Sequence, residues 1–429
     1  MEKIDIRKYL TIACIIALFV WISFFQQLFF GRYDLGVRIC LIGILALQIK
    51  SLKDVKTIFN FRSDWPQWLF LLCLLAGTVN ATNKTVVWER YFYLATTFLL
   101  LFYVGKCLYR NEKNVKFICL TICSCSILVV LIGFAELYFG RNIIYEKYIA
   151  NPFYARYFAG IAPPAELERY VRYAPCPLST QFVPAVLGSY LLGCLPFSFY
   201  FFKSKSVGLR LTGVIASLLC AIMIILSLSR GALLGLVALL LFYLWHKNRK
   251  GTKIIMSCLI LLMLLGSFWS NSRLSRFGFT EMIYGRYDSI ISEHRLSRIK
   301  MTKNILREYP FFGIGLEHFR IRFNEYSEKK DKETVPYEFM IPDNMYLTLL
   351  SETGLIGTAG FIIFLSLLFK YGIRQINKLN DCINRESLLV PLSAVIGLLV
   401  AMAGYELFYW HSPYMLFGLI TGFIQGCGD

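Results

Sequence analysis

Apolar residues occur along this chain in long runs, and short polar segments separate one run from the next. A helix that crosses a bilayer needs about 20 predominantly apolar residues. The runs that reach or approach this length are 9–30, 34–49, 66–79, 88–105, 117–139, 181–202, 207–226, 231–246, 254–270, 346–369, 388–408 and 411–426. They predict an all-α polytopic membrane protein with about 12 transmembrane helices. The first run follows Met1–Lys8 and no small-residue cleavage site comes after it, so we expect a retained span and not a signal peptide.

Basic residues fall mainly in alternate connections between these runs. The even-numbered connections hold Lys50, Lys53, Lys56, Arg62, Lys106, Arg110, Lys113, Lys116, Lys203, Lys205, Arg210, Lys247, Arg249, Lys250, Lys253, Lys370, Arg374, Lys378 and Arg385. The short odd-numbered connections hold little more than Arg32, Lys84 and Arg230. Cytoplasmic connections carry the excess of basic residues in membrane proteins. The pattern therefore predicts that both termini lie in the cytoplasm and that the number of spans is even.

Two connections are long, and both fall on the predicted outer side. The expected parts are N-terminal transmembrane helices (1–139), an extracytoplasmic loop (140–180), central transmembrane helices (181–270), a large extracytoplasmic loop (271–345) and C-terminal transmembrane helices (346–429). In the larger loop, Leu296, Ile299 and Leu306 are at helical spacing and predict a helix over 295–308, which ends before Pro310. Long loops usually carry function, so we expect the outer face to be the active one.

The composition excludes a soluble protein. Of the 429 residues, 57% are apolar and 17% are charged, whereas a soluble domain has about 25% charged residues. A net charge of +18 would suggest nucleic acid in a soluble protein. Much of the excess follows the predicted topology instead, so we expect no nucleic-acid partner. No cysteine or histidine spacing is typical of a metal site, so neither a metal nor another cofactor is predicted.

The first candidate for chemistry is Arg230, in the segment Ser227-Leu228-Ser229-Arg230-Gly231 between two apolar runs. A cation costs roughly 2.5–3.5 kcal/mol at the centre of a membrane helix, so such a residue normally has a partner. One interpretation is an interfacial arginine whose side chain extends to water. The other is an anion site, where the guanidinium binds phosphate oxygens and Ser227 and Ser229 act as further donors.

The large loop carries a second group of candidates. Arg295, Arg298 and Thr302 lie roughly along one face of the predicted helix. That face is either a solvated basic surface or part of an anion site. The Gly313-Ile314-Gly315 segment that follows the helix is either a turn or a nest of backbone amides for phosphate.

A third group precedes and enters the tenth apolar run. Either Asp343 or Asn344 is suited to cap the helix that starts there. Asp343 is also placed to act as a general base at the outer mouth of the bundle. Glu352 lies two turns deeper, where an ionisable group is expected to be paired or functional.

Taken in order, these segments resemble the O-antigen ligase and O-antigen polymerase superfamily. The resemblance rests on Ser229-Arg230-Gly231 at an outer helix junction, and on Arg295 about fifteen residues before a Pro-x-x-Gly-x-Gly segment at Pro310–Gly315. Asp343-Asn344-Met345-Tyr346-Leu347 and Glu352-Thr353-Gly354-Leu355-Ile356-Gly357 complete it. It is clear over 220–360 and looser over 140–200.

The resemblance implies a metal-independent, inverting glycosyltransferase of the bacterial inner membrane, which acts in surface polysaccharide or lipopolysaccharide biosynthesis. Such an enzyme moves a glycan from a polyprenyl (undecaprenyl) diphosphate to an acceptor hydroxyl at the outer face of that membrane. Arg230 and Arg295 match the arginines expected to bind the donor diphosphate, with Ser229 and Arg298 beside them. Asp343 occupies the position of a catalytic histidine in the ligases, and a carboxylate can also accept a proton. The expected partners are the donor, a glycan or lipid-linked acceptor, and membrane lipid.

Other functions stay open at this stage. One is a protein O-oligosaccharyltransferase of the same superfamily, and another is a flippase or transporter for lipid-linked sugars. A scaffold subunit of a polysaccharide export complex is a third. Transport predicts inverted repeats and ionisable residues near the middle of the bilayer. The candidate residues gather instead on one predicted face, which favours an enzyme.

Overall fold

The computed structural model describes residues 6–25, 34–48, 58–110, 112–139, 177, 179–181, 184–227, 229–247, 290–328, 340–378 and 382–427. Within these ranges the chain forms helices and turns and no strand, as the apolar runs predict. Eleven of the twelve predicted runs coincide with helices of the described residues. The run at 254–270 lies outside them, as do residues 140–176 and 271–289 of the two long loops.

The helices are bounded as follows. They are α1 (Ile6–Val20), η1 (Trp21–Phe25), α2 (Asp34–Gln48), α4 (Phe61–Leu74), η2 (Leu75–Thr78), α5 (Lys84–Tyr109), α6 (Glu112–Phe139), α10 (Pro184–Phe199), α11 (Val207–Leu226), α12 (Arg230–Lys247), α14 (Ile290–Glu308), α15 (His318–Ile321), α16 (Phe323–Tyr326), α18 (Met345–Lys378), α19 (Cys382–Ala401), η6 (Met402–Gly404), η7 (Leu407–Tyr409) and α20 (His411–Gly426). Of these described helices, six are long and apolar enough to cross a membrane: α5, α6, α11, α12, α18 and α19. The chain is thus an all-α membrane protein, and the count of twelve spans stays a prediction.

Aromatic side chains hold the bundle together where α4, α5 and α18 meet. The Phe70 ring stacks on Phe364 with centroids 5.5 Å apart, and lies 5.3 Å from Phe361 and 6.0 Å from Phe98. All four side chains are buried. Lipid tails are as apolar as these rings, so close van der Waals packing, and not exclusion from water, stabilises this contact in a membrane.

Lys106 differs from its predicted place in a cytoplasmic connection. It lies inside α5, fully buried, and its Nζ atom is 2.7 Å from the Oδ1 atom of Asp64 in α4. A buried lysine needs such a partner because desolvation of a lone charge is very unfavourable. Lys106 therefore ties α5 to α4 and is not part of the loop charge that sets orientation.

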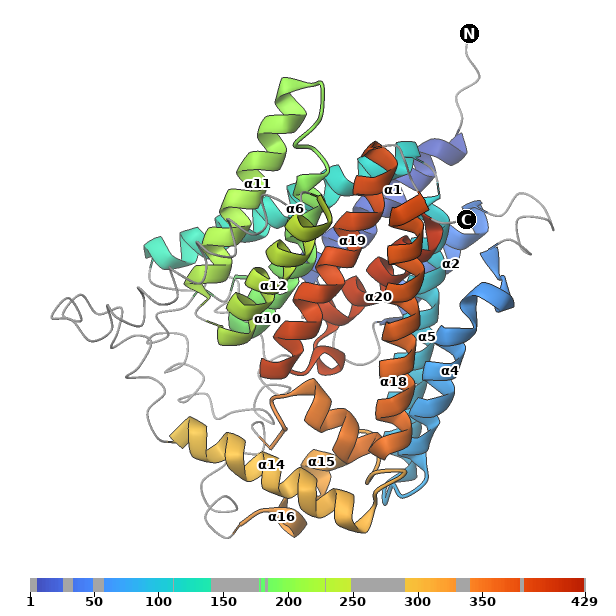
Figure 1. The fold of residues 1–429 in the computed structure, drawn as a ribbon, viewed down its shortest axis with the longest axis vertical. Coiled ribbons are helices and arrows are strands. Elements are labelled where there is room, and N and C mark those ends of the chain that lie inside the picture. The colour runs from blue at the N-terminus through green and yellow to red at the C-terminus, as the bar shows by residue number, and fades with distance from the viewer. Residues whose placement is uncertain are drawn as a thin grey trace, which may run out of the picture.

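One end of the bundle is covered by α14, α15 and α16, as Figure 1 shows. The predicted helix over 295–308 is confirmed, and α14 ends at Glu308, two residues before Pro310. Two of the apolar residues whose spacing predicted the helix, Leu296 and Ile299, are about half exposed and do not form its packing face. Instead, Met301 and Ile305 pack against a small core made by Ile314, Phe319, Phe323 and Met340.

Candidate functional site at one end of the bundle

The two glycine-containing motifs of the sequence meet at a break in α18. At Gly354 the backbone leaves the helical conformation, with φ 63° and ψ −162°. The carbonyls of Ser351 and Glu352 accept hydrogen bonds from the amides of Ile314 and Gly315, at 2.9 and 3.0 Å. On the other side of the break, the amides of Leu355 and Ile356 donate to the carbonyls of Pro310 and Phe311. The segment 310–315 therefore supplies the partners that the broken helix lacks.

This junction contradicts a phosphate nest at Gly313-Ile314-Gly315. The Gly313 amide donates to the Tyr309 carbonyl at 3.1 Å, and the next two amides bond to α18. A nest binds an anion through amides that point into open space. Since all three amides already have backbone partners, the interpretation as a turn is the correct one.

Replacement of Gly354 by alanine is expected to destabilise the protein by roughly 3 kcal/mol. A Cβ atom there would lie 2.5 Å from the carbonyl carbon and oxygen of Phe311, at a positive φ that favours glycine. The thermal unfolding midpoint in detergent micelles measures the effect. Gly208→Ala is the matched control, because its Cβ would meet nothing closer than 3.9 Å. Equal midpoints for the two variants would contradict this role of the break.

Asn344, and not Asp343, caps α18. Its Oδ1 atom accepts hydrogen bonds from the amides of Tyr346 and Leu347, at 2.9 and 3.2 Å. Its Nδ2 atom donates to the carbonyl of Ala403 in η6 at 3.0 Å. Asp343 has a left-handed backbone with φ 52°, which is unusual for a residue with a side chain. The carboxyl group of Asp343 is therefore not needed for helix capping.

Two arginines of α14 act on Asp343. Burial raises the pKa of Asp343 above its ordinary value, although the positive charges of Arg298 and Arg295 act in the opposite direction. Arg298 is itself buried, with 4% of its surface exposed, and its Nε atom donates to the carbonyl of Ile341. Arg295 is exposed. The basic face of α14 is therefore not wholly exposed to solvent. Arg298 is buried in it and holds the segment that carries Asp343.

The junction between α11 and α12, which holds Arg230, lies beside η6, the turn that Asn344 contacts. Ser229 caps α12, since its Oγ atom accepts from the amide of Ala232 at 3.3 Å. Arg230 is the first residue of α12, and its side chain is exposed. A Cβ atom on Gly231 would lie 2.9 Å from the carbonyl oxygen of Ala401 and 3.4 Å from the Cα atom of Gly404. The turn η6 thus contacts the start of α12 directly, and it contacts the cap of α18 through Asn344.

Sequence reasoning missed a buried carboxyl group next to Asp343. Glu406 follows η6, is 1% exposed, and accepts a hydrogen bond from Thr348 at 2.8 Å through its Oε1 atom. Its Oε2 atom has no hydrogen-bond partner among the described residues. Asp343 lies close enough for the two carboxyl groups to interact electrostatically. The available indication was an ionisable residue inside the apolar run 388–408.

A second missed group surrounds Glu352. The Tyr409 hydroxyl donates to its Oε1 atom at 2.6 Å, and the Phe319 amide donates at 3.3 Å. Arg90 of α5 stacks over the Tyr409 ring at 4.6 Å and pairs with Glu317 at 3.1 Å. Glu352 is therefore paired, as expected for a carboxylate at that depth.

His318 is buried close to this group but has a structural role. Its Nε2 atom accepts from the Asn83 amide at 2.9 Å, and its Nδ1 atom lies 2.8 Å from the Leu316 carbonyl. Burial lowers the pKa of His318. Because both ring nitrogens are engaged, we assign this imidazole no catalytic role.

The fold and the site define a helical membrane protein with carboxyl and guanidinium groups gathered at one end of its bundle. Residues 215–362 match the protein-family model described as O-antigen ligase. This match confirms the resemblance to the O-antigen ligase and polymerase superfamily over the segment that holds Arg230, Arg295 and Asp343. No curated protein matches the chain.

Proposed function

We propose that this protein is a glycosyltransferase of the O-antigen ligase or polymerase type, in the bacterial inner membrane with both termini in the cytoplasm. It transfers or polymerises a glycan from a polyprenyl diphosphate donor onto an acceptor hydroxyl at the outer face. The observation that carries the proposal is the position of Asp343. Its carboxyl group does not cap α18, because Asn344 does, and it interacts electrostatically with Arg298 and Arg295. The family match over 215–362 supports the class of reaction.

The donor diphosphate is the part of the substrate that the arginines suit. The diphosphate carries about two negative charges, and further negative charge develops on it as the glycosidic bond breaks. Guanidinium groups preorganised around such a leaving group lower the barrier, often by more than any other effect. Arg230 and Arg295 are exposed and supply these groups from α12 and α14. Ser229 and Arg298 are proposed as further donors to the diphosphate, and each is held in place by a hydrogen bond with the backbone.

Asp343 is the group suited to activate the acceptor. Its carboxylate accepts the proton of the acceptor hydroxyl, and the oxygen attacks the anomeric carbon. The bond from that carbon to the diphosphate oxygen then breaks, and its electron pair leaves with the polyprenyl diphosphate. Attack opposite the leaving group inverts the anomeric centre without a metal ion. A carboxylate whose pKa is raised towards neutrality is a better base than an ordinary one.

The pH dependence of transfer tests the base. Asp343 works in its deprotonated form, so activity is lost as the pH falls through its pKa. Because burial raises that pKa, we expect the acidic limb of the kcat profile to lie above pH about 4, the ordinary aspartate range. The measurement uses the purified protein, a labelled polyprenyl diphosphate glycan and candidate acceptors. Absence of transfer to any glycan, lipid-linked or protein acceptor would contradict the enzyme assignment.

A further inference from the structure

Arg38 is a cation inside the short apolar helix α2. It lies one turn after the start of this helix at Asp34, within the segment Leu35-Gly36-Val37-Arg38-Ile39-Cys40-Leu41. Its Nε atom is buried and has no hydrogen-bond partner among the described residues. An ionisable group within an apolar helix of a membrane protein normally has a partner. The described part of the chain therefore leaves this charged donor unsatisfied.

Arg38 shares an aromatic ring with Arg90 of α5. The centroid of the Tyr93 ring lies 5.8 Å from the guanidinium carbon of Arg38 and 5.5 Å from that of Arg90. Arg90 also pairs with Glu317 and stacks over the ring of Tyr409. The face of an aromatic ring attracts a cation but does not neutralise it. Two guanidinium groups and one carboxylate leave a net charge of about +1 around the ring, which favours an anionic ligand.

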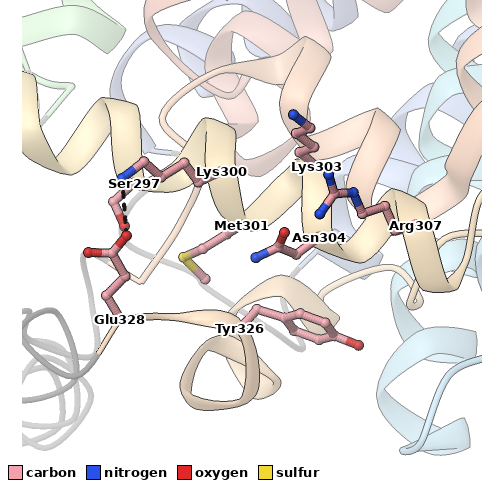
Figure 2. Close-up of a pocket in the computed structure, with 8 residues that line it drawn as sticks. All are labelled: Ser297, Lys300, Met301, Lys303, Asn304, Arg307, Tyr326 and Glu328. Carbon is pink, nitrogen blue, oxygen red and sulfur yellow. Dashed lines mark hydrogen bonds and ion pairs between the residues drawn. The ribbon is translucent and has the colours of Figure 1, made fainter.

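Other cations of the chain are balanced without a ligand. Figure 2 shows Lys300 of α14 paired with Glu328 at 3.1 Å, and Lys303 directed away from both Tyr326 and Glu328. Both lysines are exposed, so water solvates their charges. The Nε atom of Arg38 is shielded from solvent, and burial of a charged donor without a partner is costly. An external anion is therefore a more effective partner for Arg38 than for these lysines.

Apolar side chains adjoin the two arginines on both helices. Ile39 and Ile42 of α2 and Phe92 of α5 are each more than half exposed. Ile39 follows Arg38 directly, and Phe92 comes directly before Tyr93. In a bilayer, such exposed apolar side chains contact lipid tails. Because there is one apolar strip on each helix, the surface fits a lipid with two acyl chains better than a lipid with a single polyprenyl chain.

We propose that Arg38 and Arg90 bind the phosphate group of a bilayer phospholipid. The phosphate oxygens accept hydrogen bonds from the guanidinium of Arg38, whose planar fork matches them, and Arg90 adds its positive charge. One acyl chain lies along Ile39 and Ile42, and the other lies along Phe92. The site binds this lipid whether or not the chain transfers a glycan.

The test uses the full chain, purified in detergent and freed of lipid. It measures the binding of phosphatidylglycerol, of diacylglycerol with the same acyl chains, and of geranylgeranyl phosphate. We expect phosphatidylglycerol to bind at least about tenfold more tightly than diacylglycerol, which has no phosphate. Arg38→Met keeps most of the side-chain length but removes the charge, and should weaken binding of phosphatidylglycerol about tenfold. The matched control is Arg210→Met, at an exposed arginine of α11, which should bind it like the unchanged protein.

Thermal unfolding separates lipid binding from a merely structural role of Arg38. Phosphatidylglycerol should raise the unfolding midpoint of the unchanged protein and of Arg210→Met, because a ligand of the folded state stabilises it. It should leave the midpoint of Arg38→Met nearly unchanged. Without lipid, Arg38→Met should unfold at a midpoint no lower than that of the unchanged protein, since the substitution removes a buried donor that has no hydrogen-bond partner among the described residues.

Three results would overturn the inference. The first is equal affinity of Arg38→Met and the unchanged protein for phosphatidylglycerol. The second is tighter binding of geranylgeranyl phosphate than of phosphatidylglycerol, which would assign the arginines to a polyprenyl lipid. The third is a lower midpoint of Arg38→Met without lipid, which would show that contacts within the chain hold this side chain.

Discussion

Replacement of Asp343 by asparagine is expected to lower kcat by about a hundredfold to ten-thousandfold, the usual contribution of a general base. The amide is nearly the same size as the carboxylate but cannot accept a proton from the acceptor hydroxyl. The fold should survive, because the cap of α18 is the side chain of Asn344. Steady-state transfer at saturating labelled donor gives kcat, and the thermal midpoint in micelles reports the fold.

The control for this variant is Asn344→Ala. It removes the cap, so it should cost about 1 kcal/mol of stability while the base stays in place. The expected pattern is a stable, inactive Asp343 variant beside a less stable Asn344 variant that still transfers. Normal turnover by Asp343→Asn would show that this carboxylate is not the base. Glu406→Gln would then be the next variant to examine, because Glu406 is the buried carboxyl group that interacts with Asp343.

The hydrophobic pattern predicted most of the helices, because runs of apolar residues encode spans locally. It could not decide between Asp343 and Asn344 as the cap, since both residue types cap helices well. That choice depends on the contact of Asn344 with Ala403, which is 59 residues away in the sequence. Only the folded chain contains this information.

The same limit explains why the sequence left the glycine segment open between a turn and a phosphate nest. The amides of Ile314 and Gly315 bond to Ser351 and Glu352, and no local rule predicts that pairing. Arg90 and Glu406 were missed for a different reason. Arg90 lies beside Glu89 in the apolar run 88–105, and Glu406 is the one charged residue of the run 388–408. In both runs the apolar residues dominate the pattern. An ionisable residue inside a predicted span is a sign of function or pairing, and in both cases the structure supplies its partners.

Arg230→Ala and Arg295→Ala are each expected to lower kcat by about a hundredfold to a thousandfold, the loss seen when one preorganised donor to a developing anion is removed. Both side chains are exposed, so neither variant should lose more than about 0.5 kcal/mol of stability. Lysine at either position should restore part of the rate, since it keeps the charge but not the planar fork that matches a diphosphate. Arg210→Ala, an exposed arginine of α11, is the control and should leave kcat unchanged.

The double variant of Arg230 and Arg295 decides whether the two arginines act on one group. If both stabilise the same leaving diphosphate, their effects are coupled, and the double loss should be smaller than the product of the single losses. The structure supports coupling, because η6 contacts the start of α12 at Gly231 and the cap of α18 at Asn344, next to the Asp343 that Arg295 acts on. Independent, multiplicative losses would place the two guanidinium groups at separate sites. Single variants with the unchanged kcat would remove the arginines from the mechanism altogether.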